Sequence, residues 1–399
     1  MSTAVLTHPL EVDSFANKTL QAATRFWFVV LLIGQLIFAF TIASFYGLTA
    51  MRGDTAAWNK VLTHGYVAGD HIGNIVLVTH IGSAFFIILA GAIQLIPQIR
   101  NHFPVFHRWL GRFYIFTAFS VSLAGLDLMW VRGTVGDLPQ HVGTTLMALL
   151  IMFFAVMALR YAMARDFKTH RRWALRLYLT VSASLFIRAG VFLTLLLNHG
   201  AYGFDPATFT GPFLTFISFA QYLVPLGILE IYLRVTGRPG ALRRLAMAVA
   251  LFVVTLAMGA GILGATIGAF APNIKRAFDT RISIAETLSA TIAAGGVDRA
   301  VAQYHSLKSS NGSRYNFDED ELNALGYQLL AAKKYNEAIC VFRLNVEAYP
   351  KSANTYDSLG EAYMDAGEKP QAIQFYEKSL ELNPKNANRA KMLGKLKAQ

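Results

Sequence analysis

The chain has 399 residues, of which 54% are hydrophobic and only 15% are charged. An ordinary soluble protein is less apolar than this, so the composition places most of the chain in a lipid bilayer. The formal net charge of +12 would suggest a nucleic-acid partner in a soluble protein. Here the basic residues lie where membrane topology uses them, and we expect no nucleic acid to bind.

Seven apolar runs are long enough to cross the hydrocarbon core as helices of about 20 residues. They lie near 26–46, 74–96, 110–131, 140–162, 173–197, 213–235 and 245–271. A polar segment, 1–25, precedes the first run, and no small-residue cleavage site follows it. The first run is therefore expected to be a retained anchor, with 1–25 as a cytoplasmic N-terminal segment and 26–271 as a transmembrane bundle.

Basic residues favour one orientation of this bundle. They concentrate in the connections between the second and third, fourth and fifth, and sixth and seventh runs, for example Arg100, Arg165, Lys168 and Arg238. The positive-inside rule then predicts a cytoplasmic N-terminus and, after seven spans, an extracytoplasmic C-terminus in a bacterial inner membrane. Lys275 and Arg276, just after the last run, weigh mildly against this orientation.

After the last span the composition becomes that of a charged helical domain, and a period of 34 residues appears. The recurring positions are Leu325, Gly326, Ala338, Ile339, Phe342 and Pro350, then Leu359, Gly360, Ala372, Ile373, Tyr376 and Pro384. This is the tetratricopeptide pattern, in which small residues let paired helices approach closely. It predicts a domain over 282–399, with repeats near 319–352 and 353–386, a degenerate cap at 282–310 and a terminal helix at 387–399.

The repeat region resembles the helical-repeat extensions of bacterial serine-hydrolase-like domains. That resemblance implies a module that binds a protein partner or packs on its own domain. The single cysteine, Cys340, cannot form an internal disulfide.

The membrane half contains a duplication. "HIG" at His80 and "HVG" at His141 lie near the outer ends of two helices, and "FHRWLGRFY" around His107 and "THRRWALRLY" around His170 open the helices that follow. Two similar helical hairpins are implied, related by an axis along the membrane normal. That axis would place His80 opposite His141 in the outer leaflet and His107 opposite His170 near the inner surface.

A histidine pair at one depth on opposing helices is what a bis-histidine haem b requires. His80, His141, His107 and His170 are therefore candidate ligands of haem iron. Nearby arginines could pair with haem propionates, because a guanidinium suits a carboxylate. These arginines are Arg108, Arg112, Arg172, Arg176 and, at the outer level, Arg188.

Across roughly 64–240 these motifs resemble an uncharacterised bacterial membrane-protein family of unknown function. Four histidines on four central helices are also similar to the di-haem transmembrane cytochromes b, which pass electrons from ascorbate to ferric iron or other acceptors. The second resemblance implies axial ligation by His80 with His141 and by His107 with His170. His107 and His170 lie at helix starts, whereas the cytochromes bury these ligands further into the span.

Roles without a cofactor stay open for the same residues. Histidine, arginine and tryptophan at helix ends are common at membrane interfaces without any cofactor. His80 lies about 9 Å inside its span, where it needs a role as ligand, proton relay or buried hydrogen-bonding group. Asp127 and Arg188 share a depth and predict either a buried ion pair or a ligand site. Glu230 is a candidate partner of Arg160.

No phosphate loop, nucleophile elbow, dinucleotide fingerprint or zinc-type cluster is present. One hypothesis is a haem b electron-transfer protein with a quinone or small redox carrier as its partner. The alternative is a cofactor-free membrane scaffold or assembly factor whose repeats recruit an exported protein.

Overall fold

The computed structural model describes residues 4–62, 65–67, 69–133, 136–198, 200–205, 209–310, 312–384 and 387–398. It divides into two compact units, Met1–Phe278 and Asp279–Gln399. Both are helical, which confirms the predicted all-α class with membrane helices followed by helical repeats.

The first unit, here the membrane unit, contains six helices long and apolar enough to cross a bilayer, or seven if a bent pair counts as one span. The long helices are α1 (Ala4–Ile42), α3 (His71–Gln94), α5 (Pro104–Trp130), α6 (Leu138–Met163), α7 (Phe167–Val181), α8 (Ala183–Asn198), α9 (Pro212–Thr236) and α10 (Ala241–Ala265). The shorter elements are η1 (Ala43–Leu48), α2 (Thr49–Met51), η2 (Thr55–Lys60), α4 (Pro97–His102), η3 (Thr266–Phe270) and α11 (Ala271–Phe278).

The first span differs from the prediction because α1 already runs through most of the polar segment 1–25. Leu20 and Ala23 are buried there against Met247 and Leu251 of α10. These apolar residues lie on one face of the helix within the otherwise polar segment, and they pack on a neighbouring helix. This packing explains why α1 begins further towards the N-terminus than predicted. At its other end, α1 widens into the π-helix η1.

The fifth predicted span, 173–197, is not one straight helix. It consists of α7 and α8, bent by 47° at a short break. Thr180 and Ser182 donate their hydroxyls to the carbonyls of Arg176 and Tyr178, at 2.9 and 2.8 Å. Such bonds compete with the helical ladder and are typical of bends.

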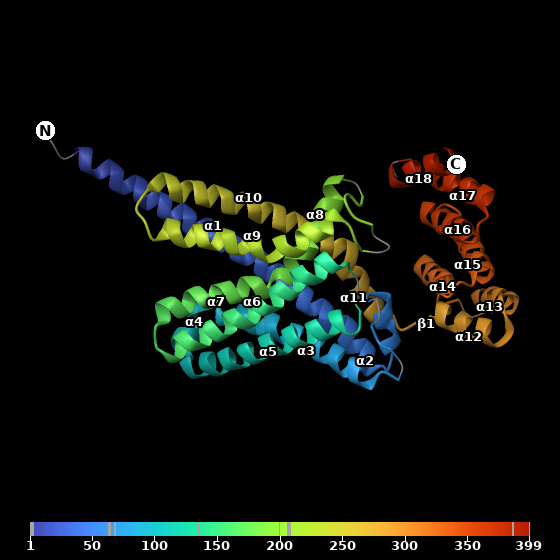
Figure 1. Ribbon diagram of the computed structural model, residues 1–399, viewed down its shortest axis with the longest axis horizontal. Coiled ribbons are helices and arrows are strands. Elements are labelled where there is room, and N and C mark those ends of the chain that lie inside the picture. Colours follow the sequence, from blue (N-terminus) through green and yellow to red (C-terminus); the bar gives the residue numbers. More distant parts are fainter. Residues whose placement is uncertain are drawn as a thin grey trace. The chain divides into compact units, whose positions relative to one another are not determined.

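Four helices form a closed bundle that we call the four-helix core: α3, α5, α6 and α7. Helix α3 packs on α5, α5 on α6 and α6 on α7, and α7 returns to α3, as the green and teal helices of Figure 1 show. Helices α3 and α6 therefore lie across one diagonal, and α5 and α7 across the other. The interior is filled by a buried cluster from all four helices: Ile87, Ala90, Tyr114, Ala118, Ile151, Phe154, Ala155 and Leu177.

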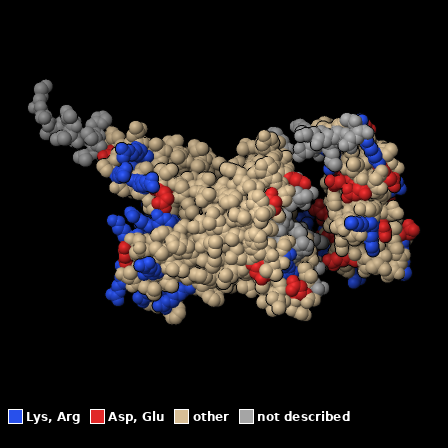
Figure 2. Space-filling view, viewed as in Figure 1, with Lys and Arg blue, Asp and Glu red and all other residues tan. Residues whose placement is uncertain are grey.

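The two ends of the membrane unit differ in charge. In Figure 2 the lysines and arginines gather at the end where α4 and the α9–α10 connection lie. At the opposite end, Arg52 donates to the carbonyl of Ala277 at 2.7 Å, which ties α2 to α11. Arg132 donates to the carbonyl of Gly65 at 2.6 Å. The chain thus enters the unit at the basic end and leaves it at the other.

The second unit, here the repeat unit, is a series of helix pairs. They are α12 (Ile284–Gly295), α13 (Val297–Ser310), α14 (Glu319–Ala331), α15 (Tyr335–Ala348), α16 (Ala353–Asp365), α17 (Lys369–Leu382) and the last helix α18 (Ala387–Ala398). A Cβ atom added at Gly326 would lie 2.5 Å from the Phe342 ring, and one at Gly360 would lie 2.6 Å from the Tyr376 ring. The periodic glycines are therefore where the paired helices touch.

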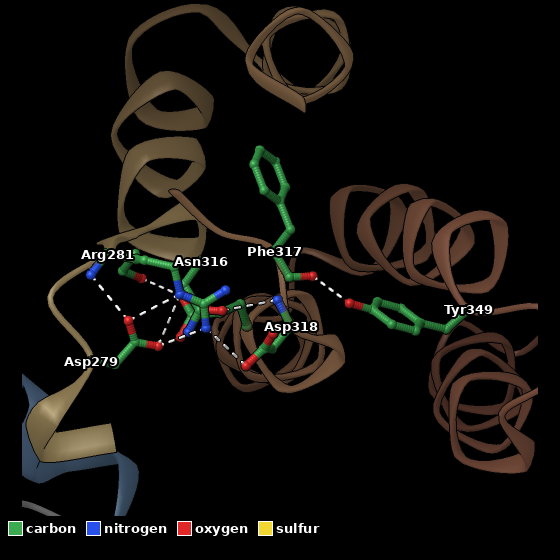
Figure 3. A network of polar contacts seen from close by, with 8 residues as sticks. Asp279, Arg281, Asn316, Phe317, Asp318 and Tyr349 are labelled. Atoms are coloured by element: carbon green, nitrogen blue, oxygen red, sulfur yellow. Dashed lines mark hydrogen bonds and ion pairs between the residues drawn. The ribbon is translucent and has the colours of Figure 1, made fainter. Parts of the chain in front are cut away.

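The start of the repeat unit is fixed by a polar network (Figure 3). Arg281 donates to Asp279 at 2.7 Å and to Asp318 at 3.2 Å, and these carboxylates raise the pKa of Arg281 above its ordinary value. The short strands β1 (Ile282–Ser283) and β2 (Tyr315–Asn316) pair in parallel beside it. The first residues of the unit are thereby held against the loop before α14.

Candidate functional site

The four predicted histidines lie on the four helices of the four-helix core, one on each. His80 of α3 and His141 of α6 belong to one diagonal, and His107 of α5 and His170 of α7 belong to the other. The apolar interior cluster lies between the level of His80 and the level of His107, because its residues occupy intermediate positions on α3 and α5.

His80 is anchored to the neighbouring helix. Its Nδ1 lies 3.0 Å from the carbonyl oxygen of Val121 on α5. One turn further along α5, a Cβ atom at Gly125 would lie 3.1 Å from Cε1 of the imidazole, so the glycine leaves room for the ring. The carbonyl contact fixes the ring plane and makes Nε2 the nitrogen that remains for another partner.

His141 presents the opposite situation. Its Nε2 is buried and has no hydrogen-bond partner among the residues that the structure describes, while its ring lies edge-on to Trp130 with centroids 5.6 Å apart. No hydrogen bond, ring contact or electrostatic interaction joins His80 to His141 in the described part of the chain. The prediction that His80 lies opposite His141 is therefore supported only by the placement of α3 and α6 across one diagonal of the four-helix core.

His107 and His170 repeat this division of roles. Nδ1 of His170 lies 2.8 Å from the carbonyl oxygen of Ala158 on α6. Nδ1 of His107 is buried without a partner. The two residues lie within electrostatic range of one another across the α5–α7 diagonal.

The surroundings of these four histidines resemble those of iron-ligating histidines in two respects. An iron-ligating histidine almost always donates its other ring nitrogen to a carbonyl, carboxylate or water, as His80 and His170 are placed to do. His141 and His107 each have a buried ring nitrogen with no partner, which costs free energy unless a ligand or metal binds it. Among the described residues no three or more histidine, cysteine or acidic side chains cluster as metal ligands; a bis-histidine haem takes only two.

The duplication is visible in side-chain contacts, with one difference. Arg112 lies over the Trp109 ring at 4.7 Å, and Arg176 lies over the Trp173 ring at 4.6 Å. When the two motifs are superposed on these tryptophans, His170 falls one position before His107. A shift of one residue turns a side chain about 100° around a helix, so the predicted equivalence of these histidines is only approximate.

The glycines of "HIG" and "HVG" also differ. A Cβ atom at Gly143 would lie 2.6 Å from the Ser218 hydroxyl of α9, whereas one at Gly82 would meet nothing within 4 Å. Gly143 therefore allows α6 to approach α9, and Gly82 has no such role.

The predicted propionate partners fall into two groups. Arg108, Arg112 and Arg172 are exposed at the basic end of the membrane unit. Arg176 instead donates through Nε to Oε1 of Glu230 on α9, at 2.7 Å. The predicted pair of Glu230 with Arg160 is wrong: Arg160 is exposed at the end of α6, and Glu230 is held by Arg176.

The predicted ion pair between Asp127 and Arg188 does not form. Arg188 donates Nη1 to the carbonyl of Ser184 on its own helix at 2.6 Å, and its guanidinium lies 4.5 Å above the Phe38 ring of α1. Arg188 follows the 47° bend between α7 and α8 and contacts α1.

Two aromatic residues of this region were not predicted. Phe38 contacts Arg188, and Tyr46 of η1 lies within electrostatic range of it. Both residues lie in the first predicted span, 26–46, whose sequence is mostly apolar. The only signal was the run "ASFYGL", where serine, tyrosine and glycine dilute the apolar pattern.

Comparisons with known proteins agree with this architecture. Residues 77–224 match the family described as a predicted membrane protein (DUF2306), a range that includes all four histidines and Arg188. Residues 353–386 match the tetratricopeptide repeat. No curated protein matches the chain. The chain is therefore an integral membrane protein in which a membrane domain similar to that family is fused to tetratricopeptide repeats.

Proposed function

We propose that the membrane unit binds haem b and transfers electrons between carriers on the two sides of a bacterial inner membrane. One observation carries the proposal. Each diagonal of the four-helix core bears one histidine anchored through Nδ1 and one with a buried, unpartnered ring nitrogen. Such an arrangement suits two bis-histidine sites, one formed by His80 with His141 and one by His107 with His170.

Haem b, when bound, accepts and releases single electrons, so the protein's task is to hold it and set its environment. The carbonyls of Val121 and Ala158 would orient the imidazoles of His80 and His170. The apolar cluster in the interior excludes water between the two levels. Arg108, Arg112 and Arg172 offer positive charge at the inner level, where propionates would need counter-ions.

Absorption spectra of the purified full-length protein, oxidised and dithionite-reduced, test the proposal. We expect a Soret band and reduced α-band absorption with two components. His80→Ala or His141→Ala should remove one component, and His107→Ala or His170→Ala should remove the other, because loss of an axial nitrogen opens the iron's coordination.

His102→Ala is the matched control, since His102 is exposed on α4 and its Nδ1 contacts the carbonyl of Gln98 in its own turn. It should leave both components unchanged. A folded protein produced with ample haem that shows no Soret band would overturn the proposal, as would equal losses in the control and ligand variants.

The second candidate is a cofactor-free scaffold or assembly factor, and the repeat unit favours it. A shallow surface pocket lies between α13 and α15, lined by Asp298, Arg343 and Glu347 among others, and tetratricopeptide repeats are typical of protein interaction. The absence of haem from the folded protein, together with capture of a specific exported protein that depends on residues 279–399, would favour this function.

The proposed orientation places the basic end of the membrane unit in the cytoplasm. The exposed arginines of α4, α5 and α7 lie at that end, as the positive-inside rule requires. The repeats would then face the extracytoplasmic side, where an exported protein could bind, and a quinone or small redox carrier would meet the haem nearest its own side.

A further inference from the structure

Arg188 carries a charge that the protein does not neutralise. It lies in α8, about 15 Å from the helix end at Asn198, well inside the span. A guanidinium stays protonated in proteins. Within the described part of the chain, its only hydrogen bond is to the Ser184 carbonyl, and it also contacts the face of the Phe38 ring. Neither partner is negatively charged, and no carboxylate among the described residues forms an ion pair with it.

An uncompensated cation in a membrane span is costly, and such residues commonly mark binding sites or ion pathways. Asp127 is the acidic residue at a comparable depth, and it makes no ion pair with Arg188. The guanidinium lies on the side of α8 that faces α1, so a negative charge from a ligand would have to be received between these helices.

Two π-helices lie close to the aromatic neighbours of Arg188. Phe38 stacks on Phe270 of the π-helix η3, with ring centroids 5.4 Å apart. Tyr46 belongs to the second π-helix, η1, and its ring packs edge-on to Trp58. Single π-turns are rare in helices and occur frequently at functional sites. One π-helix thus contains Tyr46, and the other packs on the aromatic ring that lies against the Arg188 guanidinium.

Tyr46 supplies a second kind of donor. Its phenol lies within electrostatic range of Arg188, and its hydroxyl has no hydrogen-bond partner among the described residues. The phenol O–H and the remaining N–H groups of the guanidinium are hydrogen-bond donors of the kind from which an oxyanion accepts. The planar guanidinium favours a carboxylate, which it can bind through two parallel bonds.

We propose that Arg188 and Tyr46 form a carboxylate-binding site between α1 and α8, in the half of the membrane unit away from the basic end. The site stands on these residues alone and does not require haem. The carboxylate can come from a haem propionate or from a small organic acid that exchanges freely, and these two sources are separated by experiment.

The first experiment uses the full-length protein, prepared without haem, in phosphatidylcholine nanodiscs at constant ionic strength. Acetate and succinate are titrated while the thermal unfolding midpoint is followed, with acetamide and succinamide as neutral counterparts. A ligand that binds only the folded state raises this midpoint as its concentration exceeds Kd. We expect the acids, and not the amides, to raise it.

Variants assign the effect. Arg188→Gln should abolish the response, and Tyr46→Phe, which keeps the ring packing, should weaken carboxylate affinity by about tenfold through loss of one charge-assisted hydrogen bond. Arg160→Gln, a change of the same kind at an exposed site, should respond as the wild type does. If Arg188→Gln does not fold, Arg188→Lys and Tyr46→Phe decide the question.

The second experiment separates the sources by comparing haem with its dimethyl ester. If a propionate occupies the site, Arg188→Gln weakens binding of haem but not of the ester, and haem-loaded protein no longer responds to succinate. If a free acid occupies it, haem binding is unchanged and the succinate response persists. Equal responses to acids and amides, or a full response in Arg188→Gln, would overturn the proposal whether or not haem binds.

Discussion

Cys340 offers a test at the scale of one residue, because it is the only thiol in the chain. It lies half-buried in α15. Burial raises the pKa of the thiol above its ordinary value, and the carboxylate of Asp298 raises it further, while Arg343 acts in the opposite direction. A raised pKa means less thiolate at any given pH, and the thiolate is the reactive form.

Alkylation of Cys340 by iodoacetamide, followed by mass spectrometry, should therefore be slower in the folded protein than after unfolding. The rate falls by about tenfold for each pH unit below the thiol pKa, so the rate–pH profile should move to higher pH on folding. Asp298→Asn should move it part of the way back, whereas Asp320→Asn, at an exposed site on α14, should not. Identical profiles for folded and unfolded protein would contradict this prediction.

The ionisable residues of the spans show what a single sequence can and cannot predict. The depth of a residue follows from counting along a helix, and the sequence offered Arg160 as a candidate partner of Glu230. The partner depends on how helices rotate about their axes and how closely they pack. Helix α9 packs against both α6 and α7, and Glu230 meets Arg176 of α7, while Arg160 is exposed near the end of α6.

The same substitution, glycine to alanine, should have opposite effects on stability in two helices of the repeat unit. At Gly360 of α16, an added Cβ would lie 2.6 Å from the Tyr376 ring, so Gly360→Ala should force α16 and α17 apart. At Gly394 of α18, which is 34 residues later in the same repeat position, an added Cβ meets nothing within 4 Å.

Gly360→Ala should therefore lower the free energy of opening of α16 and α17 by about 1–3 kcal/mol, as overpacking does. Gly394→Ala should raise the stability of α18 by roughly 0.5–1 kcal/mol, because alanine is the better helix former. Amide hydrogen exchange of the full-length protein, read by mass spectrometry for each helix, measures both changes. A stabilising effect at Gly360 would show that the helix contact is not what fixes this glycine.

Helices with a strong periodic pattern could be predicted, and local irregularities could not. The repeats follow from small and aromatic residues at a fixed spacing, and helices α14 to α17 lie where that spacing placed them. The bend after Val181 and the π-helix η1 have no such signal. Both depend on hydroxyl–carbonyl bonds, such as those of Ser182 and Ser44, that form only once neighbouring helices tolerate a distorted ladder.

The duplicated motifs show the same limit in the candidate site. Sequence similarity correctly grouped the four histidines on four helices that now form one core. It did not predict that His170 is displaced by one position from His107, nor that His80 and His141 both lie against α5, through Val121 and Trp130. Similar sequence motifs predict which helices carry the histidines. The direction of each side chain depends on its exact position along the helix, and a shift of one residue changes it.

The distribution of charge and the connectivity of the helices predict two different features of the whole protein's membrane topology. Charge predicts which end faces the cytoplasm, and connectivity predicts the number of crossings. The charge asymmetry in Figure 2 belongs to the membrane unit alone and predicts which end faces the cytoplasm. Connectivity is independent of charge: α11 ends beside η1, held by Arg52 to the carbonyl of Ala277, at the end where α1 also finishes. We therefore predict an odd number of crossings between Val12 and Phe278.

Reporter fusions test both statements together. Alkaline phosphatase, active only outside the cytoplasm, should be active when fused after Gln399 and inactive when fused after Gly240, in the basic α9–α10 connection. A reporter that fluoresces only in the cytoplasm should give the reverse pattern.

Helix α10 is the one predicted crossing between these sites, so the two fusions should differ whatever the orientation. If both patterns are exchanged, the positive-inside assignment is wrong while α10 still crosses the membrane. If the two fusions behave alike, α10 does not cross the membrane and the architecture itself is wrong.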